Sequence, residues 1–121
     1  MMLRKKNVIL AALAVAIAVA LSGCRAHMIT ITLINRSAQP ISTVIVDYPN
    51  ATFGKDRLEP GETFSSTVKF TDTGVVKVQF ADAKGANHSQ AGPVVHKDEM
   101  GSVEIRLDQA SAVFTPHISG R

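Results

Sequence analysis

Cys24 is the residue of this 121-residue chain with the greatest capacity for covalent chemistry. It is the only cysteine in the sequence, so no disulfide can form within the chain. Near neutral pH a thiolate is the strongest nucleophile among the side chains. The small residues Ser22 and Gly23 come directly before it, as a signal peptidase site requires. These residue types favour processing of the chain close to Cys24.

The segment before Cys24 has the layout of a secretory signal peptide. Arg4, Lys5 and Lys6 form a basic cluster, and an apolar run of 14 residues follows at positions 8–21. This run is shorter than the ~20 residues that a membrane-spanning helix needs. The alternative is an uncleaved signal anchor, but the small residues before Cys24 favour cleavage. We therefore expect residues 1–23 to be removed.

The sequence Leu21, Ser22, Gly23, Cys24 resembles the lipobox of bacterial lipoproteins. The resemblance implies a diacylglyceryl group on the thiol, cleavage just before Cys24, and acylation of the new amino terminus by a fatty acid such as palmitate. Two or three acyl chains hold a protein on a bilayer, since each buried methylene contributes ~0.8 kcal/mol. In this family an Asp after the cysteine favours the inner membrane. Arg25 stands there, so we expect the outer membrane, facing the periplasm.

His96 and Met100 are the candidates for a metal site. Residues 96–100 place imidazole, carboxylate and thioether donors within five positions. Imidazole with thioether suits copper in an extracytoplasmic protein. However, no second His-x-Met pair follows, and Met28 is the only other methionine after the signal segment. A solvated loop is the favoured interpretation, and His96 and Met100 remain weak candidates.

The sequence contains none of the common hydrolase signatures. It has no Gly-x-Ser-x-Gly, no His-Glu-x-x-His and no phosphate-cradling glycine loop. No resident cofactor other than the covalent lipid is indicated. We therefore expect a protein that is not an enzyme.

Tyr48 and Phe53 are the aromatic residues available for a surface role. They flank the segment 47–54, where Pro49 and Gly54 favour a loop from which a ring could project toward a glycan or a protein. The alternative is that both rings cap one end of the core, and we favour it. The segment is kept as a possible interaction loop.

After the signal segment, the dominant pattern is alternation of apolar and polar residues with period two, which indicates half-buried strands. The run 41–48 is apolar on both faces in its middle and is predicted to be a central strand, covered on both sides. Residues 51–55 and 88–95 are predicted to be edge strands, and Pro93 suits an edge. The expected core-facing residues are Ile29, Ile31, Leu33, Phe64, Val68, Phe70, Val76, Val78, Phe80, Val103, Ile105 and Leu107.

Turn signals separate these runs about every ten residues, which favours one all-β sandwich of about seven strands. The segment 58–62, Leu-Glu-Pro-Gly-Glu, resembles a loop of immunoglobulin-like and fibronectin-like bacterial modules, although paired cysteines and a buried Trp are missing. We place the domain at residues 29–108, after a lipidated cysteine and short tether at 24–28. Pro116 interrupts the periodicity of residues 109–121, which are predicted to be a flexible or loosely docked tail.

Charge and tether length limit the functional classes. Three of the 13 basic residues lie in the signal segment, which leaves ten basic against ten acidic residues. This balance gives no electrostatic case for nucleic acid. A tether of four residues reaches at most ~14 Å, so the domain should lie close to the membrane. We expect a structural or protein-interaction module that contacts an envelope protein; the alternative is a module that binds a metal or a glycan.

Overall fold

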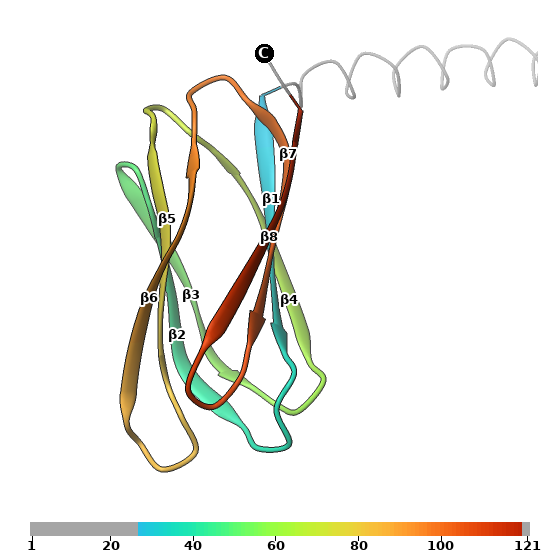
Figure 1. Ribbon diagram of the computed structural model, residues 1–121, viewed down its shortest axis with the longest axis vertical. Helices are drawn as coiled ribbons and strands as arrows, with labels where there is room; N and C mark the ends of the chain where they lie inside the picture. The colour runs from blue at the N-terminus through green and yellow to red at the C-terminus, as the bar shows by residue number, and fades with distance from the viewer. Residues whose placement is uncertain (1–26, 120–121) are drawn as a thin grey trace, which may run out of the picture.

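The computed structural model describes residues 27–119, and this part of the chain forms eight strands and no helix (Figure 1). The signal segment and residues 24–26 of the tether, Cys24 among them, lie outside the described residues. The strands are β1 (Met28–Asn35), β2 (Ile41–Tyr48), β3 (Ala51–Leu58), β4 (Thr63–Lys69), β5 (Gly74–Ala81), β6 (Asn87–Val95), β7 (Met100–Leu107) and β8 (Ala112–Ser119).

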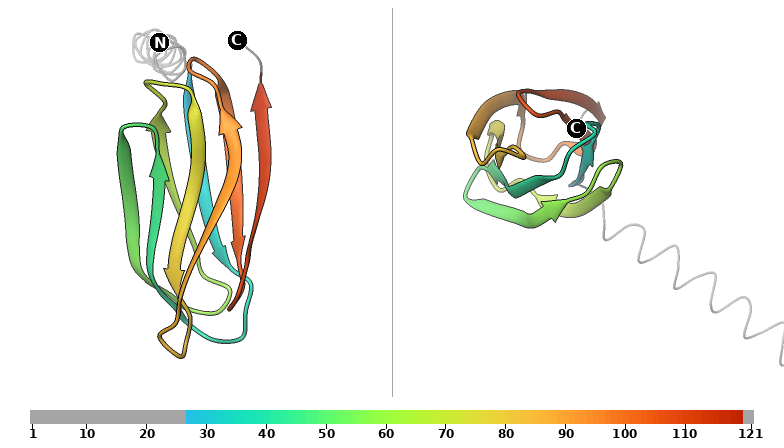
Figure 2. Two further views of the ribbon diagram at one scale, coloured as in Figure 1. Left: turned by 60° about the vertical axis from the view of Figure 1, so that its left-hand side comes forward. Right: turned by 90° about the horizontal axis from the view of Figure 1, so that it is seen from below.

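The strands form two four-stranded sheets that pack face to face as a β-sandwich. One sheet has the order β4-β1-β7-β8 and the other β3-β2-β5-β6. The view along the strands shows the two layers enclosing the interior (Figure 2). The pairing of β1 with β7 is parallel, and the other five pairings are antiparallel. The all-β prediction is confirmed, with eight strands where about seven were expected.

The core consists of the side chains that alternation predicted to face inward. Of the twelve expected residues, eleven are buried and Phe64 is half-buried against the same cluster. In β1, β5 and β7 every second residue is buried, because only one face of each sheet contacts the other sheet, whereas the edge strands β3, β6 and β8 each bury a single residue. The period-two pattern in the sequence therefore arises from this two-layer packing.

The predicted positions of the central and edge strands are also confirmed. β2 lies between β3 and β5, and β3 and β6 are the edges of that sheet. The expectation that both faces of β2 are covered is wrong, because a two-layer sandwich leaves the outer face open. Ile45 lies half-buried on that outer face, beside Gly54 of β3.

The predicted flexible tail is the main correction. Residues 112–119 form β8, which pairs with β7 over its whole length, so the domain runs from 28 to 119 rather than from 29 to 108. Phe114 lies opposite Ile105, and Pro116 opposite Val103. Asp108 N donates a hydrogen bond to the Ser111 carbonyl, so the backbone groups of Ser111 face β7. In an antiparallel pair these groups alternate between the partner strand and the free edge, so those of Pro116 face away from β7. Proline is tolerated there because β8 is an edge strand.

The chain enters and leaves the sandwich at the same end. β1 starts, and β8 finishes, at one end, which also carries the turns 49–50, 71–73 and 96–99 (Figures 1 and 2). We call this the tether end. The opposite, distal end carries the loops 36–40, 59–62, 82–86 and 108–111. Among residues 27–119 there is no helix long and apolar enough to span a bilayer.

Candidate functional site

Tyr48 and Phe53 do not flank an open loop. Tyr48 ends β2, and only Pro49 and Asn50 separate it from β3, which contains Phe53. The Tyr48 ring stacks on Phe70 with centroids 5.5 Å apart. Both rings are half-buried and pack against the core. The predicted loop is therefore wrong, and the capping interpretation of the two rings is confirmed.

His96 and Met100 lie on either side of the turn between β6 and β7. The backbone N–H of His96 donates to Glu99 Oε1 at 2.6 Å, and Glu99 N donates to the carbonyl oxygen of His96 at 3.2 Å. These two bonds close the turn, and the Glu99 carboxylate accepts a backbone hydrogen bond within it. Within residues 27–119, no three His, Cys, Asp or Glu side chains are grouped to hold a metal ion.

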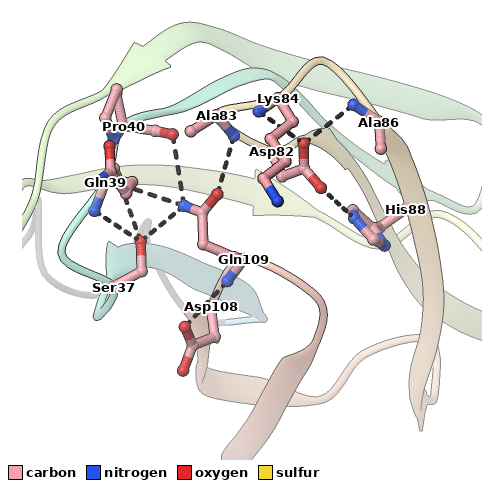
Figure 3. A network of polar contacts seen from close by, with 10 residues as sticks. All are labelled: Ser37, Gln39, Pro40, Asp82, Ala83, Lys84, Ala86, His88, Asp108 and Gln109. Carbon is pink, nitrogen blue, oxygen red and sulfur yellow. Dashed lines mark hydrogen bonds and ion pairs between the residues drawn. The ribbon is translucent and has the colours of Figure 1, made fainter.

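At the distal end, Gln109 joins three loops through one side-chain amide (Figure 3). Its Oε1 accepts a hydrogen bond from Ala83 N at 2.8 Å, and its Nε2 donates to Ser37 Oγ at 2.9 Å. Weaker contacts run from Nε2 to the carbonyl oxygens of Gln39 and Pro40. A single residue therefore connects the loops 36–40, 82–86 and 108–111, and this network was not anticipated from the sequence.

The buried side chain of Asn35 holds the loop 36–40 in place through hydrogen bonds. It is the one fully buried polar side chain among the described residues. Its Nδ2 donates to the carbonyl oxygens of Gln39 and Leu58, each at 2.9 Å, and its Oδ1 accepts from Ser37 N and Oγ. All the hydrogen-bonding groups of the amide have partners, so its burial carries no desolvation penalty for an unpaired group.

Asp82 and His88 form the charged part of the network. His88 Nε2 donates to Asp82 Oδ2 at 2.8 Å, and the imidazole stacks on Phe80 with centroids 5.2 Å apart. The hydrogen bond from His88, together with backbone N–H bonds from Ala86 and Lys84, lowers the pKa of Asp82 below its ordinary value of about 3.8. Asp82 is therefore an anion at neutral pH and holds the loop 82–86 in one shape.

Three surface hollows surround this network. The largest, about 570 Å³, is lined by side chains of the loops that Gln109 joins, among them Asp82 and Lys84. A second, about 300 Å³, lies beside His88 and Thr43. Thr43 has φ 49°, a left-handed conformation that a β-branched residue rarely adopts, where the pairing of β2 with β5 shifts register. The third, about 250 Å³, is lined by Arg36 and Arg106, among others. The distal end is thus fixed in shape and concave in places.

Comparison with known proteins gives the fold alone. No model of a known protein family matches the sequence, and no curated protein matches it. A solved structure, the NMR structure of a protein from Eubacterium rectale, has a TM-score of 0.55 and 15% sequence identity, and covers 74% of this chain and 87% of that chain. At this identity the likeness supports a shared two-sheet architecture and carries no statement about activity.

Proposed function

We propose that this chain is a lipoprotein of the bacterial envelope, anchored through acylated Cys24 in the outer membrane and facing the periplasm, where it acts as a non-enzymatic protein-interaction module. The observation that carries the proposal is the position of β1. This strand begins at Met28, four residues after Cys24, and its first residue lies at the tether end of the sandwich.

With Cys24 acylated, this position favours an orientation in which the tether end faces the membrane. Only residues 25–27 separate Cys24 from β1, and four Cα–Cα steps keep Met28 within ~14 Å of the anchored residue. Strands of eight residues then extend the distal end roughly 26 Å further, at ~3.3 Å per residue. The sides of the sandwich and its distal end are the surfaces that face other proteins of the envelope. A partner must therefore come close to the same membrane.

The distal-end network supports binding rather than catalysis. The amides of Asn35 and Gln109 and the carboxylate of Asp82 are taken up in holding loops together. Groups bound in this way give a surface a fixed shape, and preorganised surfaces bind with a smaller entropic cost. This arrangement suits a recognition module, because its polar side chains stabilise loops instead of activating a nucleophile.

The sandwich also resembles an immunoglobulin-like domain in its strand order. The strands β1 to β6 occupy the places of strands B, C, C′, E, F and G, with C′-C-F-G in one sheet and B beside E in the other. The place of strand A is taken by β7, which runs parallel to β1. We therefore propose an immunoglobulin-like domain whose first strand is replaced by a C-terminal hairpin, β7 and β8.

The anchor is tested by membrane fractionation with Cys24→Ala as the variant. The wild-type chain should remain with the membrane after washing in high salt, and its mature mass should include the acyl groups at residue 24. Cys24→Ala, in which no thioether can form, should stay unacylated. Acylation that persists in Cys24→Ala, or a wild-type chain that carries no lipid, would contradict the proposed anchor.

A ligand-binding module is the second candidate, favoured by the hollow of about 570 Å³ at the distal end. Amide and charged side chains line it, from Gln39 and Lys84, and such groups bind sugar hydroxyls. A glycan array and a thermal-shift series with copper and zinc test this candidate. A saturable shift with one ligand that Lys84→Ala removes would favour it over the interaction module.

A further inference from the structure

We propose that the free edge of β4 is a docking site for an extended peptide segment of another envelope protein, which adds a strand beside β4 and places an acidic side chain next to Lys55. This inference rests on the proposed function and names the surface through which the module acts. β4 is an edge strand of its sheet and pairs only with β1. Peptides commonly bind exposed sheet edges by adding a strand, with main-chain hydrogen bonds as the main source of affinity.

The backbone of β4 presents a regular row of free groups. Asn35 N donates to the Glu62 carbonyl at 3.1 Å, which directs the backbone of Asn35 toward β4. From there, alternation directs the N–H and C=O groups of Phe64, Ser66 and Val68 toward β1. The groups of Thr63, Ser65 and Thr67 therefore face the free edge. Seven residue pairs join β1 and β4 without a register shift, so this row is continuous.

The hydroxyl groups of Ser65 and Thr67 in β4 are hydrogen-bonded to β1, so they do not project from the free edge. Thr67 Oγ1 lies 3.1 Å from Thr30 Oγ1, and Ser65 Oγ lies 2.9 Å from Thr32 Oγ1. These cross-strand pairs hold the side chains of β4 against the outer face of the sheet. Small side chains held in this way do not obstruct the approach of another backbone.

The other three edges carry features that oppose strand addition. β6 has a register shift against β5 and contains Pro93. β8 contains Pro116, and its first N–H, that of Ala112, is taken by Gln90 Oε1 at 2.9 Å. β3 carries the charged run 55–57. Prolines, bulges and charged residues are the usual protections of an edge strand, and β4 has only Lys69 at its end.

Lys55 gives the site its charge preference. It lies opposite Val44, so its side chain points between the sheets, and its Nζ is 5.3 Å from the centroid of the Phe64 ring on β4. None of the ion pairs among residues 27–119 includes Lys55. A strand added beside β4 would pass the Phe64 ring at the edge where the Lys55 side chain reaches from β3 toward β4. A carboxylate at an inward-facing position of that strand would pair with this ammonium group.

The position of the anchor argues against a second copy of the chain as the occupant. Antiparallel pairing of two β4 strands relates the copies by a two-fold axis perpendicular to the sheet, which puts their tether ends at opposite ends of the joined sheet. A seven-residue strand spans roughly 23 Å. Two tethers of ~14 Å reach cannot then hold both domains upright on one membrane. The charge preference and the anchor therefore both favour a different protein.

The test measures binding of a defined probe to the full chain in detergent micelles. The probe is an end-blocked nonapeptide of alternating valine and threonine whose central valine is replaced by glutamate, and the control peptide has lysine there. We expect saturable binding, with amide hydrogen exchange of Ser65 and Thr67 slowed at least about tenfold in the complex. The lysine peptide should bind about fivefold more weakly, the upper end of the range for a surface ion pair, and Lys55→Gln should remove this difference.

Ser65→Pro and Ser89→Pro form a matched pair of variants, because each serine lies on an edge strand, in β4 and β6 respectively. Ser65→Pro should abolish binding of the glutamate peptide, while Ser89→Pro should leave it unchanged. Absence of binding, unchanged exchange at Ser65 and Thr67, or loss of binding in Ser89→Pro alone would overturn the proposal. So would a dimer of the chain that Ser65→Pro dissociates. None of these results depends on acylation of Cys24, so failure of the anchor remains separately visible in the fractionation experiment.

Discussion

Gly92 of β6 lies against the aromatic ring of Phe114 of β8, so closely that a β-carbon on Gly92 would overlap Cδ2 of the ring. This contact closes the side of the sandwich between β6 and β8, where the two sheets are not joined by strand pairing. The absence of a side chain at Gly92 is therefore what allows Phe114 to cover this side of the core.

Gly92→Ala should destabilise the domain because the added methyl group displaces the Phe114 ring. Overpacking of this kind costs about 1–3 kcal/mol of the free energy of unfolding. Urea unfolding of Gly92→Ala, Phe114→Ala and the double variant measures the coupling. The double variant should be less destabilised than the sum of the single variants. Strict additivity would show that the two residues do not contact each other in solution.

Removal of β8 should unfold the domain. A chain that ends at Gln109 loses the strand that pairs with β7 over eight residues, and the side chains of Phe114 and Ile118 that pack against the core. Circular dichroism and thermal unfolding compare this chain with one that ends at Ser119. We expect no cooperative transition in the shorter chain. A stable shorter domain would restore the interpretation of residues 109–121 as a loosely docked tail.

Asn35→Ala should be among the most destabilising polar substitutions in the domain. It leaves the carbonyl oxygen of Leu58 without its buried donor and releases Ser37. Loss of such a satisfied buried amide costs about 2–3 kcal/mol. Asn87→Ala, at an exposed position at the start of β6, is the control and should change stability by about 0.5 kcal/mol or less. Equal effects of the two variants in urea unfolding would contradict the assigned role of Asn35.

The contribution of Asp82 to stability should depend on pH. Because the pKa of Asp82 is lower in the folded chain than its ordinary value of about 3.8, the folded state prefers the ionised form. The stabilisation is fully present above about pH 4 and is lost as the pH falls through the folded pKa. The difference in Tm between wild type and Asp82→Asn, measured from pH 2 to 7, should therefore shrink below pH 4. A difference that does not change with pH would rule out this linkage.

The sequence predicted those parts of the fold that depend on local periodicity. β1 and β7 have strict alternation, and their inward residues are the ones expected. β8 was missed because Val113 is apolar yet points outward beside Phe114, which hides the alternation, and because Pro116 reads as a strand breaker. Proline breaks only a strand that needs its N–H, and on the free side of an edge strand no partner is lost.

The distal-end network could not be predicted by the same reasoning. Gln109 and Ser37 are 72 residues apart. Their contact depends on how the loops of two hairpins, 82–86 and 108–111, meet the loop 36–40 that crosses between the sheets. A glutamine after a strand has no local signature, because its side chain bonds to backbone groups whatever their sequence. Asn35 offered a partial signal, since an Asn at the end of an apolar strand often closes a turn. Its burial follows only from the packing of the loop 36–40 over it.

The proposed interaction module is tested most directly by a crosslinked capture of the acylated chain from its own membranes, with Cys24→Ala as the unanchored control and mass spectrometry to identify crosslinked proteins. We expect one envelope protein, recovered in near-equal amount with the anchored chain and absent with Cys24→Ala. Recovery of no protein in near-equal amount, or equal recovery with Cys24→Ala, would contradict a module that acts on its partner from the membrane.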